Sequence, residues 1–244
     1  MDSDEVIQQL SNIPLYYQPG KNWHYSIAID ILGIVIERIS GKNLEQFLKE
    51  NIFDKLEMHD TKFHLTDEER LRLQPLRVNI KPNSVFNQTE YNLDGYTIAL
   101  DGYSYREDNK AHFGGEGLVS TMNDFSRFCE MLVNDGVYNQ ERVLSSESIK
   151  TMTSKYTNGY PDPDEPGVFP DLAGYYLGFT FSVLENQDID GTGAGVGSYG
   201  WSGYHNTHFW IDPQNKMYGL FMSRAIEFDF GIPAGLKKAT YLKF

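Results

Sequence analysis

Residues 19–33, PGKNWHYSIAIDILG, form the stretch of this sequence that decides its fold. The run 27–39 is apolar on nearly every side, follows Ser26 as a candidate N-cap and stops at Gly41, a pattern typical of a helix buried within a protein. We therefore expect this helix to be a central element. Tyr25 stands at the start of the helix; taken alone, such a tyrosine is most often a packing residue with a solvated hydroxyl.

Composition limits the classes of protein to which the chain can belong. With 244 residues, 40% of them hydrophobic and 14% aromatic, it can bury a substantial core as one domain or as two packed subdomains. Its formal net charge of −13 would repel a nucleic-acid backbone or an anionic membrane, so we expect neither as a partner. The lone Cys129 allows no internal disulfide and falls in an apolar helical run, where a buried, inert thiol is expected.

Two features of the sequence bear on cellular location. It contains no uninterrupted apolar run of about 18 residues, the length that a membrane span requires. It begins MDSDE, which is acidic where a secretory signal would be basic and then apolar. We expect a soluble chain without a signal peptide, and its compartment stays unknown.

Further helices follow from capping residues and apolar spacing. They are expected at residues 43–53, 121–135, 145–153 and 233–242. Between the first two, residues 61–111 are polar and without firm periodicity, which predicts a long excursion with short helical or strand pieces.

Strands are expected in the second half of the chain. Strand-like runs occur at residues 178–184, 199–211 and 217–223. Residues 212–215, DPQN, favour a turn, so the last two runs should form an antiparallel hairpin. The order predicts an α+β fold in one domain, residues 1–244, with a mostly helical subdomain at 12–155 and a sheet with a C-terminal helix at 172–244.

Three blocks resemble, in order, motifs of the serine β-lactamase-related family, which includes class C β-lactamases, penicillin-binding proteins and family VIII carboxylesterases. Residues 19–33 are similar to its Pro-Gly-x-x-(Trp/Phe)-x-Tyr-Ser-x-x-x-x-Asp-x-Leu-Gly pattern, and residues 114–121, GGEGLVST, to its Gly-Gly-x-Gly-Leu-x-Ser-Thr segment. Residues 200–213, GWSGYHNTHFWIDP, resemble the strand that carries its Lys-Thr-Gly equivalent. The resemblance implies a β-lactamase/transpeptidase-like fold: an α-rich region plus an antiparallel sheet packed by helices.

The resemblance also implies roles for particular residues. Tyr25 matches the tyrosine that shuttles a proton beside the nucleophilic serine, a role that needs a nearby ammonium because a free phenol has a pKa near about 10. In the family that ammonium belongs to a Ser-x-x-Lys motif upstream of the tyrosine. No serine of this sequence has lysine three residues later, so we expect no nucleophile in this chain and a fold that lacks its N-terminal strands.

The Lys-Thr-Gly position reads Trp201-Ser202-Gly203, closer to a Trp-Gly-Gly variant of the family's esterases, and Ile27 stands where lactamases carry asparagine. Both differences favour an ester or peptide substrate over a β-lactam. The strand 201–204 should bind substrate and present a backbone N–H near Tyr204 to an oxyanion. Trp23 would shape the pocket, and His205 could line it.

We expect no cofactor and no metal ion. His205 and His208 lie three residues apart and would point to opposite faces of an extended strand, which argues against shared metal ligation.

Two functions remain open. The first is a serine hydrolase that cleaves a small-molecule or peptide acyl substrate, with this chain inactive by itself. The second is a non-catalytic ligand-binding or interaction remnant of the same fold. In the family the N-terminal strands pair with the last strand of the sheet, so the resemblance implies that the apolar strand 217–222 is left as an open edge. We expect the chain to self-associate through this edge or to bind a complementary N-terminal fragment there.

Overall fold

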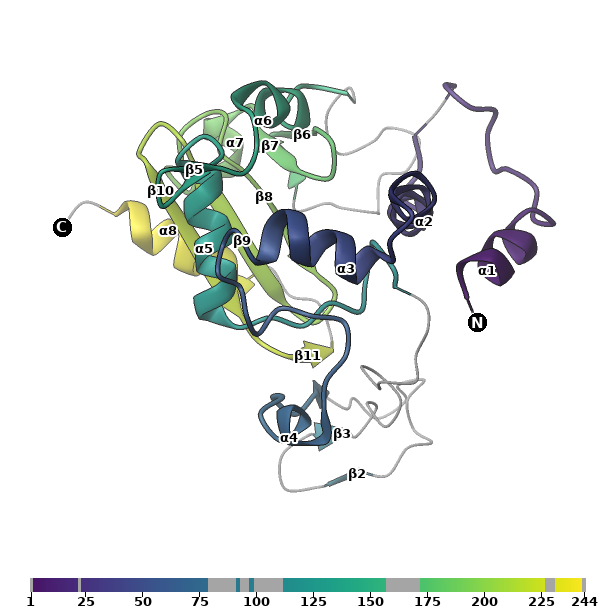
Figure 1. Cartoon of the computed structure of the whole chain (residues 1–244). Helices are drawn as coiled ribbons and strands as arrows, with labels where there is room; N and C mark the ends of the chain where they lie inside the picture. The colour runs from purple at the N-terminus through teal and green to yellow at the C-terminus, as the bar shows by residue number, and fades with distance from the viewer. Residues whose placement is uncertain are drawn as a thin grey trace. The chain divides into compact units, whose positions relative to one another are not determined.

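The computed structural model describes residues 2–21, 23–78, 91–92, 97–98, 112–156, 172–226 and 231–242 (Figure 1). The chain forms two compact units. Unit 1 comprises Met1–Leu73 and Asp101–Asp124, and unit 2 comprises Gln74–Leu100 and Phe125–Phe244. The helices expected at 121–135 and 145–153 therefore belong mainly to the same unit as the sheet. The single-domain organisation stays a prediction.

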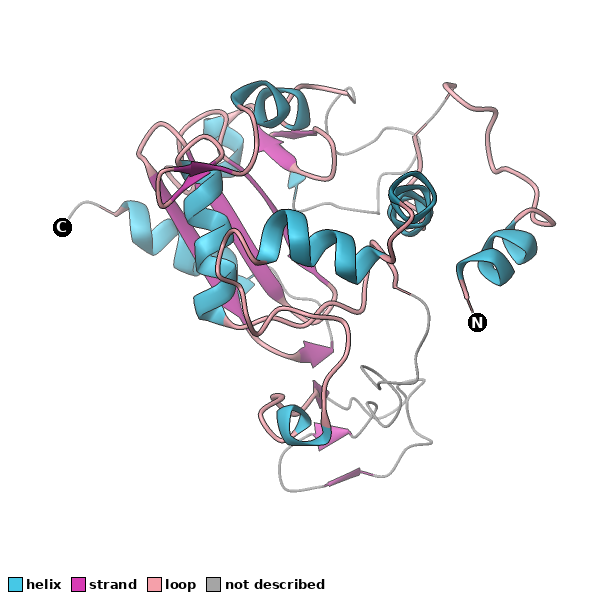
Figure 2. Cartoon of the chain, in the orientation of Figure 1, coloured by secondary structure: helices cyan, strands magenta, loops and turns pink. Residues whose placement is uncertain are grey.

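Unit 1 is built from helices. They are α1 (Ser3–Leu10), α2 (Ala28–Ser40), α3 (Leu44–Leu48), its π-helical continuation η1 (Lys49–Phe53) and α4 (Asp67–Arg70) (Figure 2). The predicted cap of the 43–53 helix is confirmed, because the Asn43 side chain accepts a hydrogen bond of 2.8 Å from the Gln46 N–H. The buried hydrophobic side chains of unit 1 are those of Ile34, Leu44, Phe53, Leu56, Met58, Phe63 and Leu65.

The helix α2 has the predicted position but not the predicted burial. It buries only Gly33 and Ile34, whereas Leu32 is 50% and Ile39 is 83% exposed. The expectation of a central buried helix is therefore wrong, because in unit 1 only one face of α2 packs closely. At its start the Ser26 hydroxyl accepts from the Ala28 N–H at 3.2 Å, one residue before the observed cap.

Unit 2 contains the main sheet and most of the remaining elements. Its helices are α5 (Met122–Val133, which begins in the last residues of unit 1), α6 (Ser146–Met152), α7 (Gln187–Asp190) and α8 (Gly231–Tyr241). The five-stranded antiparallel sheet comprises β6 (Tyr175–Leu177), β7 (Ser182–Leu184), β8 (Tyr199–Gly203), β9 (Thr207–Asp212) and β10 (Met217–Met222).

Short strands complete the unit. They are β1 (Arg77–Val78), β2 (Tyr91–Asn92) and β3 (Thr97–Ile98), which join β11 (Ala225–Ile226), and the hairpin of β4 (Val137–Tyr138) and β5 (Glu141–Arg142). With α4 of unit 1, the first three are the described helix and strand pieces of residues 61–111; most of residues 79–111 lies outside the described part of the chain.

The hairpin predicted around residues 212–215 is confirmed as β9–β10, and β10 is an edge of the five-stranded sheet. Two expected strands differ in the structure: residues 178–181 of the first form the connection between β6 and β7, and a turn at residues 204–206 divides the second into β8 and β9. Thr180, at φ 62°, lies in the turn between β6 and β7, and Asn206, at φ 61°, lies in the turn between β8 and β9. Periodicity alone missed both turns because neither contains a glycine or proline at the position of positive φ.

Strand register determines which side chains face each helix. Phe125 of α5 contacts Phe209 of β9 with ring centroids 5.2 Å apart, and the Tyr199 hydroxyl donates to the Leu132 carbonyl at 3.4 Å, so α5 packs on that face. Asp212 lies three residues after Phe209 on β9, so its side chain points to the opposite face of the sheet. It accepts a hydrogen bond from the Tyr241 hydroxyl of α8 at 2.8 Å. The sheet of unit 2 is thus covered by α5 on one face and contacted by α8 on the other.

The centre of unit 2 lies between α5 and the sheet. Its fully buried side chains include Cys129, Met131, Leu184 and Ile211. Cys129 has no exposed surface, and burial raises the pKa of its thiol to about 12. The predicted inert thiol is consistent with this environment. No helix within the described ranges is both long and apolar enough to span a membrane.

Candidate active site

Tyr25 lies in unit 1, three residues before the first residue of α2. Its side chain is 53% exposed, so solvent-borne molecules can reach the phenol. Trp23 beside it is half-buried. Upstream, the Tyr16 ring stacks on His24 at a centroid distance of 4.9 Å. Tyr25 is thus presented on an aromatic segment at the start of a helix.

The first two sequence blocks, residues 19–33 and 114–121, contact each other in unit 1. The backbone N–H of Gly115 donates to Asp30 Oδ1 at 2.9 Å. A Cβ on Gly33 would lie 3.3 Å from the backbone N of Gly114, and a Cβ on Gly114 would lie 2.3 Å from the Ile29 carbonyl oxygen. These glycines permit two backbones to approach closely, which supports a structural purpose for them.

The remaining predicted site residues lie in unit 2, on β8 and the turn after it. Trp201 pairs with Phe209 and therefore faces the α5 side, whereas Ser202 pairs with His208 on the other side. Ser202 Oγ lies 2.7 Å from His208 Nδ1, and His208 is buried. The sequence alone does not predict this pairing, because it depends on the turn at 204–206 that sets the strand register.

Close backbone contacts shape this strand. A Cβ on Gly203 would lie 2.3 Å from Thr207 Oγ1, and one on Gly200 would lie 2.0 Å from the Phe209 carbonyl oxygen. A Cβ at position 200 would require the neighbouring strand to move, whereas a Cβ at position 203 would require the Thr207 side chain to move. The third block therefore owes its glycines to the sheet as well as to any ligand.

Tyr204 and His205 lie in the turn between β8 and β9, with ring centroids 5.5 Å apart. Tyr204 is 70% exposed. The premise that His205 and His208 share one extended strand is wrong, since His205 belongs to the turn. Among the described residues, the one cluster with metal-ligand geometry does not include either histidine.

A buried carboxylate fixes the far end of β9. Asp212 accepts from the Gly195 N–H at 3.0 Å, the Asn215 side-chain N–H at 2.8 Å and the Tyr241 hydroxyl. Burial would raise its pKa, but these donors hold the pKa of Asp212 below its usual range. The turn at 212–215 is therefore held by charge-assisted hydrogen bonds rather than by turn propensity alone.

Each unit thus contributes a recognisable set of functional groups. Unit 1 presents a solvent-accessible phenol, and unit 2 presents a half-buried strand segment with an oriented hydroxyl. The elements of the two units are those of a β-lactamase/transpeptidase-like fold.

The chain belongs to the Beta-lactamase family, whose model matches residues 1–228. A protein of Mycobacterium tuberculosis described as uncharacterized is 30% identical over 227 residues, which are 90% of this chain and 53% of that protein. The lovastatin esterase of Penicillium rubens is 25% identical over 235 residues, 92% of this chain and 56% of the esterase. This chain spans about half the length of these curated relatives.

Solved structures agree on the fold. EstCE1, a hydrolase with promiscuous acyltransferase activity, matches with a TM-score of 0.78 at 21% identity, over 99% of this chain and 62% of that chain. The resemblance read from the three sequence blocks is therefore confirmed for family and fold.

Proposed function

We propose that this chain supplies the proton-shuttle tyrosine and the substrate-binding strand of a serine hydrolase that acts on an ester or peptide rather than a β-lactam. Tyr25 would move the proton, Trp201 and Trp23 would shape the acyl pocket, and the backbone beside Tyr204 would bind the oxyanion. Ser202, Gly203 and His205 would complete the substrate-binding strand and its turn.

The observation that carries the substrate preference is the replacement of the family's lysine by Trp201 on β8. β-Lactam antibiotics carry a carboxylate, and an ammonium on this strand would attract it. An indole cannot do so, and the net charge of −13 adds a repulsive field. An uncharged acyl substrate avoids this cost.

We propose further that the chain forms no acyl-enzyme by itself. Acylation requires a hydroxyl that loses its proton to a base as its oxygen attacks the acyl carbon; the bond to the alcohol or amine then breaks, and that group leaves with the proton. The sequence has no Ser-x-x-Lys motif to supply such a hydroxyl with its ammonium neighbour. A complementary segment with this motif would pair along the edge strand β10.

The first experiment uses the chain alone. We would incubate it with a chromogenic short-chain ester and, separately, a fluorescent penicillin, and search for an acyl adduct by intact mass spectrometry. No adduct and no turnover are expected. A covalent intermediate with turnover of either reagent by pure protein would overturn the proposed inactivity.

The second experiment adds a co-expressed segment that carries the family's Ser-x-x-Lys motif. Ester cleavage is expected to appear and to fall about 100-fold or more in Tyr25→Phe, since general acid–base catalysis contributes about 10²–10⁴-fold. Tyr156→Phe is the matched control, because Tyr156 is similarly exposed at 51% but lies outside the three blocks. If a folded complex binds the ester without cleaving it, the chain is a binding remnant instead. Light scattering would show whether a second copy, rather than the added segment, occupies the β10 edge.

A further inference from the structure

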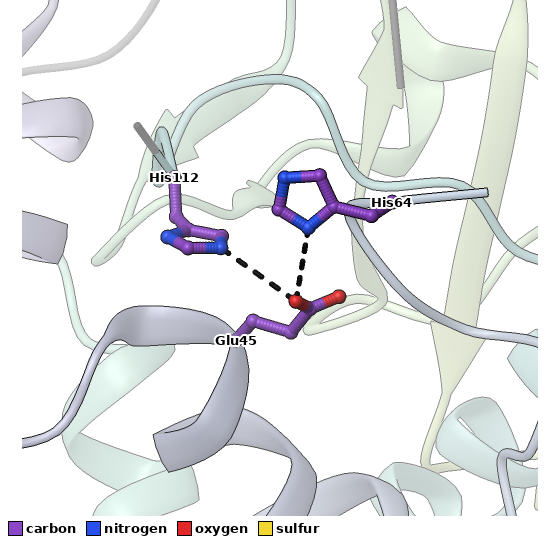
Figure 3. Close-up of side chains that lie close together, drawn as sticks. All are labelled: Glu45, His64 and His112. Carbon is purple, nitrogen blue, oxygen red and sulfur yellow. Dashed lines mark hydrogen bonds and ion pairs between the residues drawn. The ribbon is translucent and has the colours of Figure 1, made fainter. Parts of the chain in front are cut away.

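Glu45, His64 and His112 form a cluster in unit 1, and none of the three is among the predicted site residues (Figure 3). Glu45 lies in the first turn of α3, His64 lies between η1 and α4, and His112 lies just before the glycine block 114–117. One ligand atom from each lies within 4.8 Å of the others. Three segments that are distant in the sequence therefore present metal-binding atoms to one point.

The two distances from the Glu45 carboxylate to the imidazoles are close to those between ligands of one metal ion. Glu45 Oε2 lies 3.1 Å from His64 Nδ1 and 3.6 Å from His112 Nε2. Two ligands at about 2.0–2.1 Å from a tetrahedral Zn²⁺ are separated by roughly 3.3 Å. The carboxylate oxygen is thus already spaced for shared coordination with both imidazoles, and the two rings stand nearly perpendicular at 89°.

His112 provides the second observation that points to a ligand. Only 6% of this residue is exposed, yet within the described residues neither of its ring nitrogens has a hydrogen-bond partner. Such buried polar atoms are rare in folded proteins and call for a bound partner. Burial lowers the pKa of His112 and so favours its neutral imidazole.

The neighbouring carboxylates have the geometry of a supported metal site. Glu45 Oε1 accepts from the Phe63 N–H at 2.8 Å, which fixes the carboxylate and directs Oε2 toward the histidines. Burial would raise the pKa of Glu45, but the Phe63 N–H and His64 hold this pKa below its usual range. Glu37 Oε1 lies 3.7 Å from His112 Nδ1, on the side away from Glu45, where metal-bound imidazoles commonly have an outer carboxylate.

We propose that Glu45, His64 and His112 bind a Zn²⁺ ion or a similar first-row transition metal through Oε2, Nδ1 and Nε2, with a water as fourth ligand. Two imidazoles and a carboxylate are a ligand set that suits this class of ion. The ion would link α3 to the segment that contains His64 and to the segment that contains His112. The partly exposed side chains of His64 and Glu45 provide its path of entry.

The test begins with the full chain, stripped of metal by dialysis against a chelator. Co²⁺ is then added as a spectroscopic probe, and visible absorption of a four-coordinate site is expected to saturate at one equivalent and to disappear on addition of Zn²⁺. Zn²⁺ at a hundredfold excess over its dissociation constant should raise the melting temperature by roughly 5–10 °C. Mg²⁺ should not, because it prefers an octahedral shell of oxygen ligands.

His64→Gln and Glu45→Gln are the informative variants, because both side chains are partly exposed and their loss leaves less strain than loss of His112. Each is expected to abolish the Co²⁺ spectrum and the Zn²⁺ shift while the chain stays folded by circular dichroism. The matched control is His59→Gln, since His59 is an exposed histidine of unit 1 outside the cluster. A folded native chain without a Co²⁺ spectrum overturns the proposal, and so does a spectrum that survives in both cluster variants.

Discussion

Asp30 Oδ1 accepts a hydrogen bond of 2.9 Å from the backbone N–H of Gly115, 85 residues further along the chain. This contact joins the helix after Tyr25 to the glycine block, so two of the three family motifs meet in unit 1. Their closest approach is at Gly114, where no side chain has room.

Gly114→Ala is expected to destabilise unit 1. Its Cβ would lie 2.3 Å from the Ile29 carbonyl oxygen, a backbone atom that cannot rotate away. Overpacking of this kind costs about 1–3 kcal/mol and sometimes more. Urea denaturation would measure the loss. Gly235→Ala in α8 serves as control, because a Cβ there meets nothing within 4 Å; an equal loss in both variants would contradict the steric explanation.

Ser202→Ala is expected to lower stability by about 1–2 kcal/mol, because it leaves the buried His208 without the hydroxyl that lies 2.7 Å from Nδ1. Ser198 is the comparison, since it is also buried beside β8 but its hydroxyl has no hydrogen-bond partner in the part of the chain that the structure describes. Ser198→Ala should be neutral or slightly stabilising. Thermal unfolding of the two variants decides between this account and one based on side-chain size alone.

The stability of unit 2 should depend on pH through Asp212. Its pKa is lowered in the folded state by the donors of Gly195, Asn215 and Tyr241, so its contribution is complete above the unfolded-state pKa of about 3.9 and is lost as the pH falls below it. In Asp212→Asn, urea midpoints measured from pH 6 to 3 should lose this part of the acid dependence. The exposed Asp188→Asn should retain it, and identical profiles would argue against the assignment.

Lys237 and Asp190 form a buried pair between α8 and α7. The Lys237 ammonium lies 3.8 Å from Asp190 Oδ1 and donates to the Tyr175 hydroxyl at 2.8 Å, while burial lowers the pKa of Lys237. Lys237→Met should cost about 3–5 kcal/mol, because it leaves a buried carboxylate uncompensated. The double variant with Asp190→Asn should recover much of this loss. Chemical denaturation of the three variants completes the cycle; simple additivity would show that the two groups are not coupled.

The order of helices and strands could be predicted from capping residues and periodicity. Asn43 and Thr121 begin their helices as expected, since each side chain accepts a backbone N–H hydrogen bond of the first turn. The hairpin β9–β10 also follows from its turn residues. These features depend on neighbours in the sequence, so local chemistry is sufficient to predict them.

The features that sequence missed depend on distant residues. Residues 27–39 are apolar on nearly every side, which predicts a buried helix. Burial also depends on what packs against the helix, and α2 buries only Gly33 and Ile34. The His208 partner of Ser202 follows from a turn whose positive φ is adopted by Asn206 without glycine. The cluster of Glu45, His64 and His112 unites three separate segments, and no spacing rule connects them.

The lone thiol of Cys129 gives this protein a built-in reporter. Cys129 is a residue of α5, and its side chain is fully buried with its pKa raised to about 12. An alkylating reagent can therefore modify it only after that part of unit 2 opens. The rate of labelling therefore measures how often the enclosed region becomes accessible, without an engineered probe. A cysteine introduced at an exposed position would react first, so surface labelling and opening could be followed separately in one sample.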